Sequence, residues 1–72
     1  MSAPELVPVD SSSIAAVGYD PATRVLHVRF VSGRAYLYHD VPPSTYAALL
    51  RAESKGAYFN REVRDAFRFT RR

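Results

Sequence analysis

Cysteine and tryptophan are both missing from this chain of 72 residues, which contains only three glycines. Without cysteine the chain can form no disulfide, no thiolate metal site and no cysteine nucleophile. The glycines are isolated, so no phosphate-binding loop or dinucleotide fingerprint is present. No apolar run approaches the roughly 20 residues of a membrane span, and residues 1–10 lack the pattern of a signal peptide. These absences predict a small soluble domain in the cytoplasm and exclude most catalytic chemistry.

The length allows one domain, because a chain of this size has too little interior for a second core. Hydrophobic residues make up 47% of the chain and charged residues 24%, a globular composition that argues against disorder. We expect a flexible lead-in over residues 1–10, in which Val7 or Val9 is a candidate for docking on the domain. The domain itself is expected over residues 11–68, followed by a basic tail over residues 69–72.

Residues 14–39 show the pattern of three short strands. Apolar side chains alternate most clearly over residues 24–30, which is typical of a half-buried strand. Asp20 and Pro21 favour a turn before this segment, and Gly33 favours a bulged hairpin loop after it. The sequence therefore predicts antiparallel strands over residues 14–19, 24–30 and 34–39.

The length of the second hairpin loop decides the face on which Tyr36 and Tyr38 lie. A three-residue loop places both tyrosines on the apolar face of the preceding strand, whereas a two-residue loop reverses every side chain. We prefer the three-residue loop, because it gathers five large side chains on one side. The same register places His27 and His39 on the other face, where we expect both to be mostly exposed.

Two amphipathic helices are predicted to follow the strands. Pro43 cannot donate a hydrogen bond to a sheet, and it suits the first turn of a helix. The apolar spacing predicts helices over residues 43–52 and 55–67, with Ser54 as the N-cap of the second and Asn60 as an alternative start. The predicted fold is α+β, a three-stranded antiparallel β-meander with two C-terminal helices packed on one face. The expected core contains Leu26, Val28, Phe30, Leu49, Val63 and Phe67.

Basic residues are concentrated at the C-terminal end of the chain. The formal net charge is +3, but residues 51–72 carry seven Lys or Arg against three Asp or Glu, a net charge of +4. Arginine forms bidentate pairs with phosphates and stacks on bases, so this concentration predicts a polyanion as partner. A solvated helix face with a frayed basic end is the alternative explanation. If the second helix continues to residue 71, one side of it carries a stripe of four arginines: Arg61, Arg64, Arg68 and Arg71.

No constellation of catalytic or metal-binding residues is apparent. A metal site needs three or four ligands, whereas His27 and His39 have only Asp40 near them in the sequence. A Ser-His-Asp triad could be drawn from a serine of residues 11–13, one of the two histidines and Asp40. Such a triad would lack a nucleophile elbow and an oxyanion hole. We therefore expect no enzymatic activity, no cofactor and no metal.

Five tyrosines are a large number for so short a chain. Proteins that bind single-stranded nucleic acid combine basic side chains with aromatic rings on which the bases stack. Tyrosine also serves as a bulky core residue with its hydroxyl at the edge, which is the role we expect for Tyr36 and Tyr38. Tyr58, beside the basic residues, is the better candidate for a stacking residue.

Several short motifs together resemble the KTSC domain family, and they extend from about residue 11 to residue 67. That family is named after a C-terminal appendage of some lysyl-tRNA synthetases and also occurs as small free-standing proteins of bacteria and phages. The family has no established activity, and the resemblance implies RNA binding only through this association with a tRNA enzyme. The motifs are Ser12-Ser13-Ile14, Gly18-Tyr19-Asp20, Phe30-x-x-Gly33-x-x-Tyr36-x-Tyr38-x-x-Val41-Pro42, Tyr46-x-x-Leu49-Leu50, Ser54-Lys55-Gly56-x-Tyr58-Phe59-Asn60 and Val63-Arg64.

These observations predict a non-enzymatic binding module for RNA or another nucleic acid, with no membrane association. The alternative is a protein-interaction module that presents the basic helix to an acidic surface of the transcription or translation machinery. In either case the expected binding surface consists of Arg61, Arg64, Arg68, Arg71 and Arg72, with Lys55, Arg51 and Tyr58 nearby.

Overall fold

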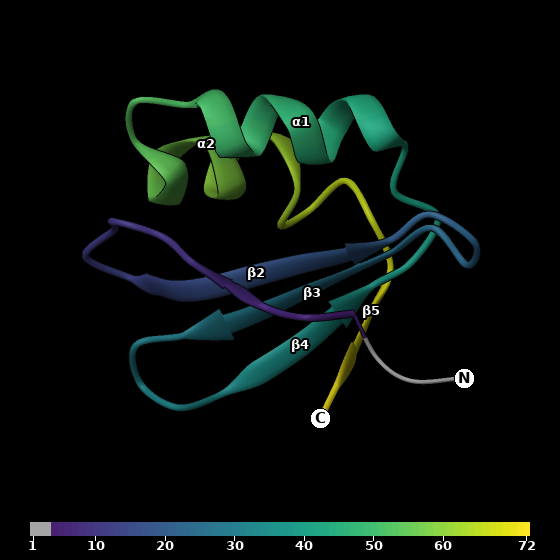
Figure 1. The fold of residues 1–72 in the computed structure, drawn as a ribbon, viewed down its shortest axis with the longest axis horizontal. Coiled ribbons are helices and arrows are strands. Elements are labelled where there is room, and N and C mark those ends of the chain that lie inside the picture. The colour runs from purple at the N-terminus through teal and green to yellow at the C-terminus, as the bar shows by residue number, and fades with distance from the viewer. Residues whose placement is uncertain (1–3) are drawn as a thin grey trace.

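Two helices cover one face of a five-stranded antiparallel sheet in the computed structural model, which describes residues 4–72 (Figure 1). The strands lie side by side in the order in which they occur in the chain. Within this part of the chain, no helix is long and apolar enough to cross a bilayer. The elements are β1 (Val7–Pro8), β2 (Ile14–Asp20), β3 (Val25–Phe30), β4 (Ala35–Tyr38), α1 (Pro43–Arg51), α2 (Lys55–Glu62) and β5 (Phe69–Arg71).

The three central strands have the register that the sequence predicts. Strand β3 pairs with β4 so that Val28 lies opposite Tyr36, and Leu26 lies opposite Tyr38. The loop between them has a φ of +98° at Gly33, a conformation that glycine adopts without strain. Tyr38 is only 2% exposed and Tyr36 is half-buried. The prediction that both tyrosines lie on the helix-covered face is confirmed.

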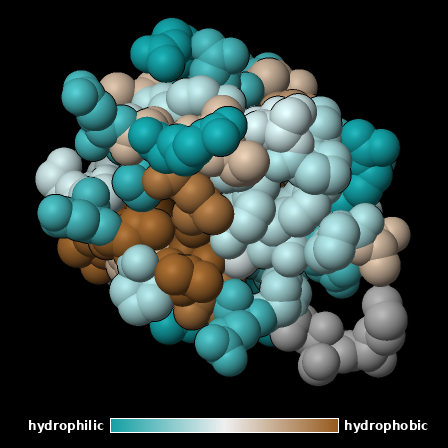
Figure 2. All heavy atoms as spheres, turned by 45° about the horizontal axis from the view of Figure 1, so that its top comes forward, coloured by the Kyte–Doolittle hydropathy of each residue, from teal (hydrophilic) through white to brown (hydrophobic). Residues whose placement is uncertain are grey.

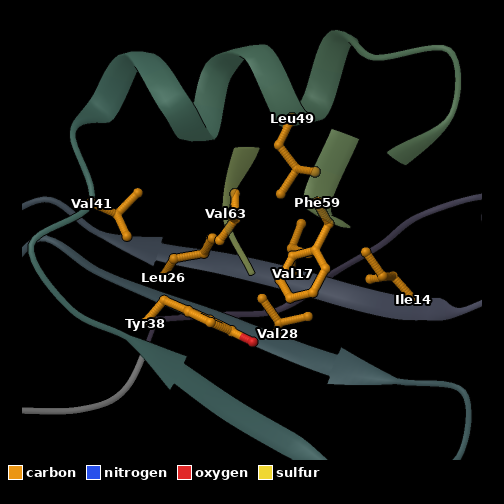
Figure 3. Packing of buried hydrophobic residues seen from close by; sticks show 9 residues of the cluster. All are labelled: Ile14, Val17, Leu26, Val28, Tyr38, Val41, Leu49, Phe59 and Val63. Carbon is orange, nitrogen blue, oxygen red and sulfur yellow. The ribbon is translucent and has the colours of Figure 1, made fainter. Parts of the chain in front are cut away.

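The hydrophobic core fills the space between the sheet and the helices (Figure 3). Four of the six residues predicted for the core are fully buried, whereas Phe30 and Phe67 are only partly buried and pack against its edge. In Figure 3, Leu49 points from α1 toward the sheet, and Phe59 points between the helices and the strands. The buried set is Ile14, Val17, Leu26, Val28, Tyr38, Val41, Leu49, Phe59 and Val63.

Local signals determine where the helices begin. Helix α1 begins at Pro43, because proline needs no hydrogen-bond acceptor in the first turn. The Ser54 hydroxyl caps α2 by accepting a hydrogen bond from the Ala57 amide at 3.2 Å. The predicted end of the second helix at residue 67 is wrong. Helix α2 ends at Glu62, and the chain turns over residues 63–66.

The sheet has two more strands than the sequence predicts. Residues 69–72 are expected as a frayed tail, but Phe69–Arg71 pairs with β4 as strand β5. The Phe69 ring stacks on the Tyr36 ring at a centroid distance of 5.4 Å, which adds side-chain contact to the backbone pairing. Within the expected flexible lead-in, Val7–Pro8 pairs with β2 as strand β1. The part of this expectation that concerns residues 1–3 lies outside the described residues.

The opposite face of the sheet is less open than the sequence predicts. A Cβ atom on Gly18 would lie 2.9 Å from atoms of residues 5–6, so the chain before β1 passes directly over this position. His27 is paired with Gly18 and is half-buried. The His39 Nε2 atom lies 2.8 Å from the Thr70 hydroxyl of β5, and His39 is also half-buried. The prediction that both histidines are mostly exposed is wrong, because the segment before β1 and strand β5 partly cover them.

Neighbouring leucines on α1 provide a test of the helix packing. Leu49 is fully buried, so Leu49→Ala should lower the free energy of unfolding by about 2–5 kcal/mol. Leu50 is 38% exposed, so Leu50→Ala should cost less than about 1 kcal/mol. Urea unfolding of the two variants measures both losses, and similar losses would contradict the orientation of α1.

The attachment of β5 is tested with Phe69→Ala. We expect the free energy of unfolding to fall by about 1–2 kcal/mol, because a half-exposed ring and its aromatic contacts are removed. Amide hydrogen exchange at His39 and Arg72 should become faster, since these amides donate to the carbonyl groups of Arg68 and Ala35 across the same strand pair. Phe69→Tyr keeps the ring and is the matched control. Unchanged exchange in Phe69→Ala would show that the backbone pairing alone holds β5.

Candidate functional site

The predicted stripe of four arginines does not form. It requires one helix that continues to residue 71, whereas α2 ends at Glu62 and the chain then turns into β5. The members of the stripe are divided among α2, the segment that follows it, and β5: Arg61, Arg64, Arg68 and Arg71. The prediction of a single basic helix face is therefore wrong.

Three of the predicted site residues come together where α1 ends and α2 begins. Arg51, Tyr58 and Arg61 line a hollow of about 530 Å³, which we call the α1–α2 hollow. The Arg61 guanidinium carbon lies 5.8 Å from the centre of the Tyr58 ring, within the range of a cation–π contact. The Arg61 Nε atom also donates to the Glu62 carboxylate at 3.1 Å. A base that stacked on Tyr58 would share the ring with this arginine.

Lys55 lies at a second hollow, of about 470 Å³, at the first turn of α2. Its ammonium group donates to the carbonyl oxygen of Ala52 at 3.1 Å. Residues 11–13 form the opposite wall of this α2 N-terminal hollow. A Cβ atom on Gly56 would lie 2.7 Å from the Ser13 hydroxyl oxygen, so the absence of a side chain lets the helix approach this segment closely.

Arg64 lines a third hollow, on the other side of α2, which we call the aromatic groove. The groove has a volume of about 630 Å³, and Arg34 contributes a second positive charge from the end of the β3–β4 loop. None of its lining residues is acidic. The lining residues are Ser12, Ser13, Phe30, Val31, Ser32, Arg34, Tyr36, Tyr38, Phe59, Asn60 and Arg64.

Four aromatic rings in contact form the apolar part of the groove. Phe30 meets Tyr36 and Phe59 edge to face, with centroid distances of 5.5 and 5.4 Å. Tyr38 meets Phe59 in the same way at 5.3 Å. Phe59 and Tyr38 are buried, whereas Phe30 and Tyr36 are half-buried. The groove therefore has a fixed aromatic floor and two rings that remain accessible from solvent.

The Tyr38 hydroxyl is a hydrogen-bonding group without a protein partner at this site. None of the side-chain hydrogen bonds among residues 4–72 involves this hydroxyl, and no fully buried side-chain polar atom in this part of the chain lacks a partner. The small exposed fraction of Tyr38 must therefore include its oxygen atom, and Tyr38 lines the aromatic groove. Burial, with a smaller contribution from Tyr36, raises the pKa of Tyr38 above its usual value, and the charge of Arg64 opposes this. The hydroxyl remains protonated near neutral pH and is able to donate.

The last three arginines lie apart from these hollows. An Arg68 guanidinium nitrogen lies 3.6 Å from the Asp40 carboxylate on the exposed surface. Arg71 is paired with Tyr36 at the edge of the sheet. Arg72 lies near His27 on the face away from the helices. Burial lowers the pKa of His27, and the charge of Arg72 adds to this effect.

The three hollows adjoin one another around α2, and together we call them the α2 strip. The aromatic groove shares Ser12, Ser13 and Asn60 with the α2 N-terminal hollow. That hollow in turn shares residues Glu53, Ser54 and Ala57 with the α1–α2 hollow. Two acidic residues, at positions 10 and 53, line the strip. They are outnumbered by its five cationic residues, Arg34, Arg51, Lys55, Arg61 and Arg64.

The surface seen from the helix side is mostly hydrophilic, with hydrophobic atoms gathered in one area at the left of Figure 2. Four large hydrophobic residues of the described chain are more than a third exposed, and they come from four different parts of the fold: Val7, Val31, Leu50 and Phe69.

Across residues 4–72 no group of three or more His, Cys, Asp or Glu side chains is placed to hold a metal ion.

The aromatic groove is not predicted as a site from the sequence, although most of its residues belong to recognisable motifs. Eight of the eleven lining residues belong to the motifs that resemble the KTSC family, the exceptions being Val31, Ser32 and Arg34. The motifs are scattered over residues 12–64, and the fold brings them together. Arg34 carried no signal of its own, because an arginine next to a hairpin loop is an ordinary surface residue.

Comparison with known proteins agrees with these motifs. The family model of the KTSC domain matches residues 10–67. A protein of Tsukamurella paurometabola is 51% identical over 61 residues, which cover 85% of this chain and 91% of the relative. The crystal structure of a KTSC domain protein from Yersinia pestis has a TM-score of 0.92 and 34% sequence identity, and the match covers 97% of this chain and 99% of that one.

Longer proteins also contain a region similar to this chain. A lysine–tRNA ligase of Nostoc punctiforme is 38% identical over 64 residues, which cover 89% of this chain but 11% of the ligase. The similarity thus concerns one small part of that protein. The motifs that converge on the aromatic groove agree with the match to the family model. The chain belongs to the KTSC domain family, because the family model matches most of it and its fold is shared with a KTSC domain protein.

Proposed function

We propose that this protein is a non-enzymatic RNA-binding module whose binding surface is the α2 strip. The observation that carries the proposal is that arginines lie beside aromatic rings in two of the three hollows of this strip. Arg34 and Arg64 lie at the aromatic groove, and Arg51 and Arg61 lie with Tyr58 in the α1–α2 hollow. Arginine supplies phosphate contacts, and aromatic rings supply stacking surfaces for bases.

The charge of the strip supports a polyanionic partner. Five cationic and two acidic residues line it, and among residues 4–72 neither Arg34 nor Arg64 has an acidic group within 4.0 Å. An arginine that is not neutralised by the protein can contact a phosphate without first breaking an ion pair. Such contacts release counterions and give affinity with little dependence on base sequence.

The relative in Nostoc punctiforme supports RNA as the polyanion. Its name describes an enzyme that joins lysine to tRNA, and 11% of it is similar to this chain. An enzyme with this activity must bind tRNA, which is a polyanion. This support is by association with a larger protein, whereas the arrangement of arginines and rings is a property of the chain itself.

The proposal predicts a steep dependence of RNA binding on salt that originates in the α2 strip. Four or five phosphate contacts correspond to a slope of roughly 3 on logarithmic axes, at about 0.7 per contact for single strands. A variant with Arg51→Gln, Arg61→Gln and Arg64→Gln together should reduce this slope by about 2 and weaken binding. Fluorescence anisotropy with tRNA and with single-stranded RNA, at several salt concentrations, measures both quantities.

The matched control removes the same charge elsewhere. Arg29, Arg68 and Arg72 lie outside the α2 strip, so their joint replacement by Gln should weaken binding much less. Equal losses in the two triple variants would show that net charge alone matters and would contradict the proposed surface. If the wild type binds no RNA at physiological salt but captures an acidic protein that the first triple variant loses, the chain is instead a protein-interaction module.

A further inference from the structure

The aromatic groove combines three features that a ligand would have to match, and they lie within one hollow of about 630 Å³. Its floor is apolar and aromatic, it is lined by Tyr38, whose hydroxyl has no protein partner among residues 4–72, and two cations lie at its edge. This volume is within the range of about 300–1,000 Å³ that is typical of small-molecule sites.

We infer that the aromatic groove holds one unpaired base of a single-stranded nucleic acid, with the Tyr38 hydroxyl donating to the base and Arg34 and Arg64 contacting the adjacent phosphates. The inference rests on the proposed function and assigns a particular ligand unit to one of its hollows. It concerns the base and its phosphates, which RNA and single-stranded DNA share.

The apolar part of the groove fits a flat ring. The contacts that Phe30 makes with Tyr36 and Phe59 are edge to face, with interplanar angles of 69° and 73°, so these rings do not cover one another by parallel stacking. Phe30 and Tyr36 remain partly exposed, although Phe69 already stacks on one face of the Tyr36 ring at a centroid distance of 5.4 Å. A base that enters the groove meets these two rings first, and contacts of this type stabilise bound bases without selecting their sequence.

The hydroxyl of Tyr38 gives the groove a polar contact at its base. Tyr38 is 2% exposed, and its hydroxyl takes part in none of the side-chain hydrogen bonds within the described residues. A nearly buried donor that faces a hollow favours a ligand with an acceptor atom, since water or ligand must satisfy it. Every nucleobase carries acceptor atoms on its edge. Asn60 lines the same groove and offers both a donor and an acceptor.

The positive charge distinguishes a nucleotide from an apolar peptide side chain. Arg34 follows the β3–β4 loop and Arg64 follows α2, so the two cations come from different elements on the rim of one groove. None of the lining residues is acidic, and an apolar side chain would leave both arginines without a partner. Phosphates on either side of an inserted base would satisfy them.

The depth of the rings favours an unpaired base over a duplex. Tyr38 and Phe59, at the floor of the groove, are at most 4% exposed. Bases in a double helix are stacked and paired, and the major groove of double-stranded RNA is too narrow for side chains to read. Only a base that is turned out from a single strand, a loop or a bulge can reach this floor.

The test uses fluorescein-labelled 12-nucleotide single strands of RNA and DNA, and a hairpin RNA whose bases are all paired except in its loop. Tyr38→Phe keeps the ring and removes one oxygen, and it should weaken single-strand binding about 3–10-fold with the salt slope unchanged. Tyr46→Phe is the matched control, because Tyr46 stacks on Tyr19 and does not line the groove. We expect it to bind like the wild type.

Two further measurements keep the inference falsifiable if Tyr38→Phe is unstable. Asn60→Ala, at an exposed position, should weaken binding of the single strands. NMR signals of the Phe30 and Tyr36 rings should shift during titration with either single strand, and also with the hairpin, because its loop contains unpaired bases. A fully paired duplex with the sequence of the hairpin stem should cause no such shifts.

The failure of this inference differs from the failure of the proposed function. If the strands bind with the expected salt slope, but Tyr38→Phe and Asn60→Ala have no effect and the ring signals do not move, the inference is overturned and the proposed function stands. Equal binding to a fully paired duplex would also overturn it. If no nucleic acid binds at all, both proposals fail.

Discussion

Strand β3 presents Leu26, Val28 and Phe30 to one side of the sheet, and the other elements are positioned by the need to cover that side. The strands on either side of β3 add Val17 and Tyr38 to the same face. A sheet with one apolar face is stable only when another layer covers it. Helices α1 and α2 form that layer, and the edge of the layer is where the aromatic groove opens.

The central register was predictable because two independent constraints agree on it. Alternation along residues 24–30 defines an apolar face, and the loop with Gly33 places Tyr36 and Tyr38 on that face. The helix starts were predictable because proline and serine act through their own backbone and hydroxyl groups. Each of these signals lies within a few residues of the structure that it determines.

The outer strands and the end of α2 depended on contacts that are distant in sequence. A two-residue strand such as Val7–Pro8 is too short to show alternation. Phe69 and Thr70 have side chains that suit a strand, but they follow a segment whose apolar spacing at Phe59, Val63 and Phe67 fits a helix. Pairing with β4 makes this segment a strand. No residue near position 69 indicates that β4 will be its partner.

The candidate site was predictable in composition but not in arrangement. The arginines and Tyr58 were identified from their types and positions, yet the stripe assumed that one helix carried all of them. The groove instead receives residues from the segment before β2, from β3, β4 and the β3–β4 loop, and from α2 and the turn after it. Such convergence depends on the whole fold, so a search along one element cannot find it.

The two outer strands have a consequence for how molecules of this protein meet one another. An open sheet has two edges whose free backbone groups can pair with a strand of another molecule. Here one edge is the two-residue strand β1, in which Pro8 has no amide hydrogen to donate. The other edge is the three-residue strand β5, which carries the positive charge of Arg71. Both edges are therefore poor templates for a further strand, and the sheet ends at five strands instead of growing into an aggregate.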